Sequence, residues 1–346
     1  MKITRREFMK FLGLFMITAP LRIQMPLKMP SFDVKKRSLE KNGKAVKIKV
    51  IGIGGAGGNI IDSLVKFGLN GIELIAANTD SQFLEINEAP CKILLGSTND
   101  LYNKDLETGY KAALENKGKI KMVLEGSDIV FIVAGMGGCT GTGGAPVVAK
   151  IGKEIGAWTI AIVTLPFCFE GKRRVALSKR GLEWLKETAN MTIVIPNDCI
   201  FKMMPPSANL LMALQYSDKI FCEIIRDFLA FFKNRDMISC LDIKQIKTMF
   251  GKVGIASLGI GEGNSLKESI ESALSCPLLE GAFLKRITKI LAFLRISGNE
   301  TLEELRKAVS ILDRTFDKKA ILLWDTIIDE DIEKPQVKVI LGRKTC

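Results

Sequence analysis

The ten residues 135–144 (Gly-Met-Gly-Gly-Cys-Thr-Gly-Thr-Gly-Gly) contain six glycines and two threonines. Glycines let backbone N–H groups approach a phosphate closely, and threonine hydroxyls can bond phosphate oxygens or the water shell of Mg²⁺. The segment follows an apolar, β-branched run at 128–134, which predicts a buried strand, and precedes a helix predicted at 145–156 with Pro146 in its first turn. A glycine loop between a strand and a helix is typical of phosphate binding. A Walker P-loop is excluded, because the G-x-x-x-x-G-K-[ST] pattern is absent.

A second glycine-rich run, 54–59 (Gly-Gly-Ala-Gly-Gly-Asn), repeats this layout nearer the N-terminus. It follows a strand predicted at 46–53 and precedes a helix predicted at 60–67. A strand, a glycine loop and a helix form the layout in which backbone amides and a helix N-terminus hold phosphate.

The first of these loops also fits a different class of protein. Gly52, Gly54 and Gly57 match the G-x-G-x-x-G pattern of dinucleotide-binding proteins, and Asp80 falls near the end of the next predicted strand, 72–77. Taken alone, this loop allows an NAD-dependent oxidoreductase. The glycine- and threonine-rich run at 135–144 argues against that interpretation.

The amino-acid composition excludes several classes of catalytic and metal-binding site. The sequence has no histidine, which excludes Ser-His-Asp triads, Cys-His proteases and histidine-ligated zinc sites. The eight cysteines have no C-x-x-C spacing and are expected to be reduced thiols used as small apolar residues. With 346 residues, 47% hydrophobic and 25% charged, the chain is long enough for about two globular domains.

Residues 137–143 (GGCTGTG) resemble the GGGTGTG signature of the tubulin/FtsZ superfamily, with Cys139 in place of one glycine. The resemblance covers nearly all of residues 46–341. Further segments resemble FtsZ motifs in the family's order: NTD at 78–80, TLPFCFEGKRR at 164–174, IPND at 195–198 and SCPLLE at 275–280.

The resemblance implies an α/β fold with a parallel-sheet GTP-binding domain, a long central helix and a smaller α+β C-terminal domain. Sequence periodicity agrees, because strands and helices alternate up to Ile195 and residues 210–233 form a long, largely apolar helical stretch. The expected divisions are a basic leader (1–45), the GTP-binding domain (46–209), the central helix (210–235) and the C-terminal domain (236–346). Strands of a second sheet are predicted at 255–261, 287–296, 320–325 and 337–341.

The resemblance also implies a GTP or GDP site, carried over residue by residue. Glu170 and Arg174 match the family residues at the ribose and base, with a surface ion pair as the alternative. Asn197 and Asp218 match the residues that read guanine. Mg²⁺ is expected to be held mainly by phosphate oxygens and water, so no residue is assigned as a metal ligand. The phosphate-binding residues implied are Gly54, Gly55, Ala56, Gly57, Gly58 and Asn59 from one loop and Gly137, Gly138, Cys139, Thr140, Gly141, Thr142 and Gly143 from the other.

Two positions of this site depart from the family pattern. The family stacks a phenylalanine on the base, and that position matches Ala213 here, with Tyr216 one turn away as a substitute. The segment between Gly96 and Gly109 has no glycine, whereas the family's loop is glycine-rich and senses the γ-phosphate. Contacts with a γ-phosphate therefore stay open.

The hydrolytic residues depart as well. In the family, a loop patterned N-x-D-F-A-D-V from the next subunit completes the active site. The matching segment, 240–246, reads Cys-Leu-Asp-Ile-Lys-Gln-Ile, so Asp242 keeps the first carboxylate and Gln245 replaces the second. Losing a carboxylate weakens general-base help worth about 10²–10⁴-fold, although a glutamine can still orient water. Asp242 and Gln245 are thus the implied catalytic residues, with slow hydrolysis expected.

The basic charge of the chain is concentrated at its N-terminus. Residues 1–49 carry a net charge of +10, and the remaining 297 residues carry only +2, which argues against a nucleic-acid partner. Thr4–Lys10 resembles a twin-arginine signal, and the apolar run 11–21 is about half the length of a membrane span. We expect residues 1–22 to contact a membrane surface, with an export signal and a disordered leader as alternatives. A cytoplasmic location is favoured, because GTP is scarce outside the cell.

Two functions are consistent with these features. The first is a GTPase that polymerises head to tail and acts in cell division or membrane remodelling. The second is a GTP- or GDP-binding partner that caps or co-assembles with a standard FtsZ and scarcely hydrolyses GTP.

Overall fold

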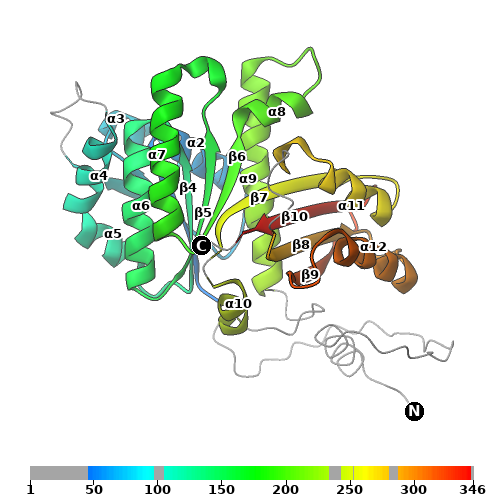
Figure 1. The fold of residues 1–346 in the computed structure, drawn as a ribbon. Coiled ribbons are helices and arrows are strands. Elements are labelled where there is room, and N and C mark those ends of the chain that lie inside the picture. Colours follow the sequence, from blue (N-terminus) through cyan, green and yellow to red (C-terminus); the bar gives the residue numbers. More distant parts are fainter. Residues whose placement is uncertain (1–45, 97–104, 234–242, 252, 280–286, 344–346) are drawn as a thin grey trace.

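The computed structural model describes residues 46–96, 105–233, 243–251, 253–279 and 287–343. The leader and Asp242 lie outside these residues. Ten strands and the helices between them form a mixed α/β fold (Figure 1). The strands are β1 (Ile48–Ile53), β2 (Glu73–Asn78), β3 (Cys91–Leu94), β4 (Ile129–Gly135), β5 (Trp158–Leu165), β6 (Met191–Pro196), β7 (Gly254–Glu262), β8 (Lys289–Ile296), β9 (Ile321–Ile328) and β10 (Gln336–Gly342).

The helices of the described residues connect these strands. They are α2 (Gly54–Phe67), α3 (Ser81–Ile86), α4 (Leu106–Glu115), α5 (Lys117–Leu124), α6 (Cys139–Glu154), α7 (Lys172–Thr188), α8 (Asn197–Met203), α9 (Leu210–Lys233), α10 (Ile243–Phe250), α11 (Leu266–Leu274) and α12 (Leu302–Thr315), with short 3-10 turns η2 (Cys168–Glu170) and η3 (Pro277–Leu279).

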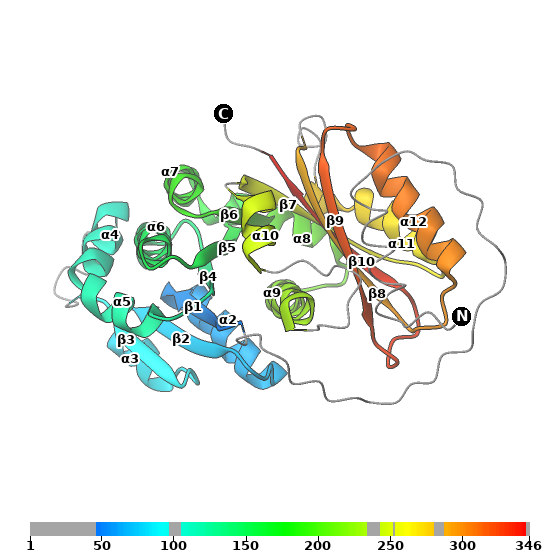
Figure 2. The ribbon, with the colours of Figure 1, turned by 90° about the horizontal axis from the view of Figure 1, so that it is seen from below.

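Strands β3, β2, β1, β4, β5 and β6 lie side by side in that order and run parallel. Alternate residues of β4 enter two different cores: Phe131 packs toward α2 and α9, and Ile132 packs toward α4 and α6. Helices therefore cover both faces of the parallel sheet, as Figure 2 shows. The expected α/β domain with helices on both faces is confirmed.

The predicted second sheet is wrong, because the C-terminal strands continue the first one. Residues 254–257 of β7 pair in parallel with residues 191–194 of β6. Strand β10 then pairs antiparallel with both β7 and β8, and β9 completes the sheet beside β8. This pairing covers the edge that β6 would otherwise expose. Helices α11 and α12 pack on one face of these strands, and α9 packs on the other.

The run 54–59 forms the first turns of a helix, and the run 135–144 ends β4, makes a short turn at 136–138 and begins a helix. Helix α2 begins at Gly54 and α6 begins at Cys139, so each helix starts six residues before the predicted position. Pro146 consequently lies inside α6 and not in its first turn. Four glycines within 138–144 leave room for the chain to enter this helix directly from β4.

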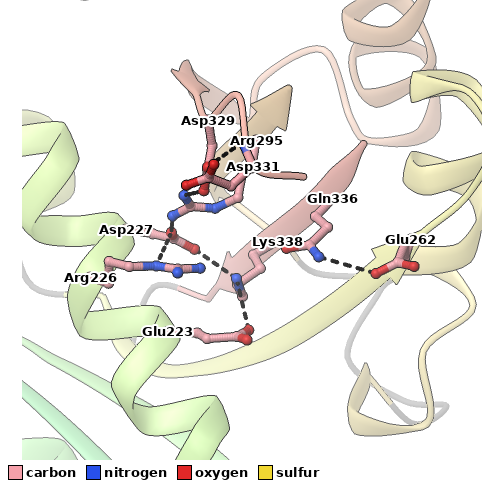
Figure 3. A network of polar contacts seen from close by, with 9 residues as sticks. All are labelled: Glu223, Arg226, Asp227, Glu262, Arg295, Asp329, Asp331, Gln336 and Lys338. Atoms are coloured by element: carbon pink, nitrogen blue, oxygen red, sulfur yellow. Dashed lines mark hydrogen bonds and ion pairs between the residues drawn. The ribbon is translucent and has the colours of Figure 1, made fainter. Parts of the chain in front are cut away.

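Helix α9 has the predicted bounds and lies between the two halves of the sheet (Figures 1 and 2). Its apolar side carries Phe228, which packs on Phe131 of β4 and on Phe293 of β8. On the side facing β8 and β10, Asp227 pairs with Arg295 and with Lys338, both nearly buried (Figure 3). This helix is thus fixed to the C-terminal strands by both packing and charge.

No helix within the described ranges is both long and apolar enough to cross a membrane.

Candidate functional site

The carboxyl ends of the parallel strands meet at one edge of the sheet. Strand β1 leads directly into α2, β4 into the glycine-rich start of α6, and β6 into α8. Asn78 ends β2, and Leu165 ends β5 just before η2. In open parallel sheets this edge is where ligands bind.

The N-termini of α2 and α6 converge at this edge. A Cβ atom added to Gly54 would lie 3.0 Å from the backbone nitrogen of Gly141, and one added to Gly135 would lie 2.7 Å from Cβ of Ala56. Neither helix has an acidic residue in its first turn or a side chain that caps its N-terminus. Two adjacent helix N-termini with these features favour an anion between them.

The glycines of the two runs divide into two roles. Gly54 and Gly137 have φ values of +74° and +99°, which only glycine adopts without strain. Gly57 and Gly143 are buried against backbone atoms, so they allow close packing. Gly55 is exposed, and an added Cβ would come no nearer than 3.9 Å to Phe83.

The threonines of the second run also differ in role. Thr142 is fully buried, and its hydroxyl accepts the N–H of Gly137 at 2.8 Å, so it shapes the turn. Thr140 is partly buried, and its hydroxyl lies 2.7 Å from the hydroxyl of Thr79, beyond β2. Thr79 was not among the predicted site residues, although its N-T-D motif was a signal for it.

Glu170 and Arg174 pair with each other in the structure. Glu170 also accepts the backbone N–H of Phe167 at 2.9 Å. A Cβ added to Gly137 would lie 3.0 Å from the carbonyl oxygen of Arg174, so the first turn of α7 adjoins the phosphate-binding turn. The pair therefore lies where a nucleotide's sugar could reach it, and its assignment as ligand residues stays a prediction.

Asn197 is the first residue of α8 and is 7% exposed. Its Oδ1 is buried and has no hydrogen-bond partner among the described residues. A buried acceptor without a donor is costly, so this amide favours a ligand that brings an N–H group. Guanine offers such donors at N1 and N2.

Asp218 lies on α9 and is partly buried. The Ser63 hydroxyl of α2 donates to its Oδ2 at 3.3 Å. Burial raises the pKa of Asp218 to about 6, and the hydrogen bond from Ser63 acts in the opposite direction. Sequence reasoning missed Ser63, because nothing in the chain indicates that α2 and α9 are neighbours.

The structure does not support a base-stacking position at Ala213, because this residue is packed in the core. Ala213 is 1% exposed and lies in the hydrophobic core. Tyr216 lies seven residues, or two helical turns, before Glu223 and so shares its side of α9. Burial, with Glu223 nearby, raises the pKa of Tyr216. Leu214 is 43% exposed and lies one helical turn before Asp218, so it is the apolar side chain on the Asp218 side.

Of the two implied hydrolytic residues, the structure describes the position of Gln245 only. Gln245 is in α10, at the opposite end of the molecule from α8 in Figure 1, and Asp242 lies outside the described residues. Asp218 lies fifteen positions before Lys233, the end of α9, which corresponds to about 22 Å along the helix axis. The structure therefore does not bring Gln245 to the nucleotide edge of its own chain.

No cluster of three or more metal-ligating side chains occurs in the portion of the chain that the structure describes. The edge presents two helix N-termini, the buried amide of Asn197 and the partly buried carboxylate of Asp218. These features define a nucleotide-binding α/β protein.

Comparison with known proteins gives the family. Residues 47–205 match the model of the tubulin/FtsZ family, GTPase domain. Cell division protein FtsZ 1 of Methanocaldococcus jannaschii is 38% identical over 301 residues, which cover 85% of this chain and 82% of the relative. Cell division protein FtsZ of Pseudomonas putida is 36% identical over 82% of this chain and 73% of its own length.

Solved structures agree with the sequence relatives. A structure of an empty FtsZ dimer from M. jannaschii superposes with a TM-score of 0.79 at 36% identity, covering 86% of this chain and 88% of the other. CetZ1 of Haloferax volcanii, at 20% identity, covers 87% of this chain and 95% of its own, with a TM-score of 0.72, and supports the fold. The chain belongs to the tubulin/FtsZ family, and its N-terminal half is that family's GTPase domain.

Proposed function

We propose that the protein binds GTP and GDP at the edge formed by α2, α6 and α8, polymerises head to tail, and hydrolyses GTP slowly. The observation that carries this proposal is the convergence of two uncapped helix N-termini at the same edge of the sheet that carries Asn197, whose buried Oδ1 has no partner among the described residues. Phosphate would occupy the helix N-termini, and guanine would supply the missing donor. Magnesium would bind mainly through phosphate oxygens and water.

Hydrolysis between subunits follows from the length of α9. The proposed nucleotide edge lies at one end of the molecule, and α10, which contains Gln245, lies at the other (Figure 1). A second copy stacked end to end would place its Asp242 and Gln245 against the nucleotide of the first. The M. jannaschii relative forms a dimer in its structure, which supports self-association of a similar chain.

Exposed apolar side chains supply a surface for such stacking. Six of them lie on or near the nucleotide edge, and we call them the apical apolar patch: Phe169, Phe201, Leu210, Leu211, Met212 and Leu214. They belong to η2, α8 and the start of α9. Exposed apolar groups of this size favour a protein partner, and a second copy of the chain fits the proposal.

Slow hydrolysis rests on Gln245 in place of a carboxylate. We expect the wild-type protein to turn over GTP slowly and Gln245→Asp to accelerate turnover by 10-fold or more, because a carboxylate assists proton removal from water by about 10²–10⁴-fold. The measurement is phosphate release by the full chain with GTP and Mg²⁺, with GTP affinity measured in parallel. Fast wild-type turnover that Gln245→Asp leaves unchanged would remove the proposal of slow hydrolysis.

The second candidate is a regulatory partner of a standard FtsZ that binds GTP or GDP without useful hydrolysis. The loss of both the asparagine and the second aspartate of the loop, at Cys240 and Gln245, favours it. Sedimentation separates the two candidates. Pelleting with GTP alone supports the polymerising GTPase, and nucleotide binding without pelleting supports the partner.

We place the protein's action in cell division or membrane remodelling, as the names of its relatives suggest. A cytoplasmic location and a membrane contact through residues 1–22 stay predictions, since those residues lie outside the described ranges.

A further inference from the structure

One contact at the nucleotide edge joins the two helices that flank it. Ser63 lies on α2, nine residues after Gly54, and donates its hydroxyl hydrogen to Asp218 Oδ2 at 3.3 Å. Helix α2 therefore presents its N-terminus to phosphate and, about 13 Å further along its axis, a hydroxyl to the carboxylate that would read the base. No other side-chain partner of Asp218 is found in the described part of the chain.

No charged partner compensates the Asp218 carboxylate from the elements packed against it. On α2, Asp62 accepts the backbone N–H of Glu88, and Lys66 pairs with the Glu88 carboxylate. On α8, Asp198 accepts the N–H of Cys168, and Lys202 is exposed.

The neighbours on α9 itself do not compensate it either. Lys219 pairs with Glu223. The thiol of Cys222 has its pKa raised to about 12 by burial and by Asp218, so it stays neutral in the working pH range. Ser63 is thus the group that stabilises the charged form of Asp218.

The charge of Asp218 decides which base it matches. An ionised carboxylate has acceptors only, and it accepts bonds from N1–H and the N2 amino group of guanine. A protonated carboxyl offers one donor and one acceptor, which match N1 and the N6 amino group of adenine. The Ser63 hydroxyl uses one of about four lone-pair positions on the carboxylate, so room for two base donors remains.

We propose that Ser63 is a positioning residue that holds Asp218 ionised and oriented, and thereby selects guanine over adenine. This inference rests on the proposed nucleotide function. It predicts that guanine selectivity falls as the pH falls through the value at which Asp218 protonates, which burial sets near pH 6. Without the Ser63 hydrogen bond, the same loss occurs at higher pH.

The test measures GTP and ATP affinities of the full chain by calorimetry between pH 5.5 and pH 8.5. Both nucleotides carry the same triphosphate, so the ratio of their affinities cancels titration of the phosphates. We expect the ratio for wild type to fall below about pH 6.5. For Ser63→Ala we expect the midpoint of this fall to move up by about one pH unit, so that the ratio below the midpoint drops by about 10-fold.

Two further variants separate positioning from a structural effect. Ser63→Thr keeps the hydroxyl and is expected to restore the wild-type profile. Asp218→Asn offers one donor and one acceptor at every pH and is expected to show low, pH-independent selectivity. A Ser63→Ala profile that coincides with wild type, or a Ser63→Thr profile that follows Ser63→Ala, would overturn the role of Ser63 alone. A wild-type chain that binds no GTP at pH 8 would overturn the proposed function as well.

Discussion

At Gly55, the proposed phosphate site has a glycine that lowers the stability of helix α2 but would let a phosphate come close to the backbone. It occupies the second position of α2, is exposed, and has room for a Cβ atom, which would lie 3.9 Å from the Phe83 ring. Alanine is favoured over glycine in helices by about 0.5–1 kcal/mol, so the glycine lowers the stability of the helix. Neither packing nor a positive φ requires this glycine, and the proposed function accounts for it as a position where a phosphate would approach the backbone closely.

We therefore expect Gly55→Ala to raise the free energy of unfolding by up to about 1 kcal/mol and to weaken GTP binding. Gly118→Ala is the matched control, because Gly118 lies in α5, away from the site, and has no atom within 4 Å of an added Cβ. The control is expected to gain similar stability with unchanged affinity. Denaturant unfolding and calorimetry measure the two quantities. Wild-type GTP affinity in Gly55→Ala would contradict the assignment of this turn to phosphate.

At the scale of elements, α9 is held against the C-terminal strands by a buried ion network (Figure 3). Asp227 is 1% exposed and is bonded by Arg295 of β8 and, at 2.8 Å, by Lys338 of β10. Lys338 also reaches Glu223 at 3.2 Å, and Arg295 reaches Asp329 at 2.6 Å. Such a network contributes little net stability over apolar packing, but removing one member leaves a buried charge uncompensated.

Arg295→Met is accordingly expected to lower the free energy of unfolding by about 3–5 kcal/mol, because Asp227 loses a buried cation and keeps only Lys338 and the more distant Arg226, at 3.9 Å. The double variant Asp227→Leu/Arg295→Met removes a charge of each sign and leaves Lys338 with Glu223, so we expect it to be more stable than the single variant. Arg306→Met is the control, since Arg306 pairs with Glu303 on the exposed side of α12 and should change stability little. A double variant less stable than the single one would contradict this account of the network.

These contacts mark the limit of prediction from the sequence. The bounds of α9, and the approximate positions of the strands, follow from apolar periodicity, which is a local property of the chain. The glycine-rich turns were identified as phosphate-binding, but their helical conformation depends on packing against each other. Lys338 lies 111 residues from Asp227, so no local pattern predicts their pairing. A charged residue inside an otherwise apolar strand, as at Arg295 and Lys338, was the available signal.

At the scale of the whole molecule, one continuous sheet joins the nucleotide edge to the C-terminal strands. Strand β7 pairs with β6 on one side and β10 on the other, and α9 packs on both halves. A subunit built in this way has α8 and the proposed nucleotide edge at one end and α10 at the other (Figure 1). Head-to-tail contact would thus join the proposed nucleotide site to the proposed hydrolytic segment of the next copy.

The apical apolar patch tests this arrangement directly. Leu211 is 62% exposed in the first turn of α9, where a carboxylate is favoured by the helix dipole, so Leu211→Glu should leave the fold intact. We expect it to raise the concentration needed for GTP-dependent pelleting by 10-fold or more, because each contact would bury a charge without a partner. Met122→Glu is the control, since Met122 is 70% exposed on α5, away from the patch.

Leu211→Glu also tests whether GTP turnover depends on assembly. If hydrolysis needs Asp242 and Gln245 of a second copy, Leu211→Glu should bind GTP with wild-type affinity while its turnover falls in parallel with its pelleting. Turnover and sedimentation are measured on the same samples over a range of protein concentrations. Turnover that persists without pelleting would show that one chain completes its own active site, which the length of α9 argues against. Pelleting equal to wild type would instead remove the patch from the assembly interface.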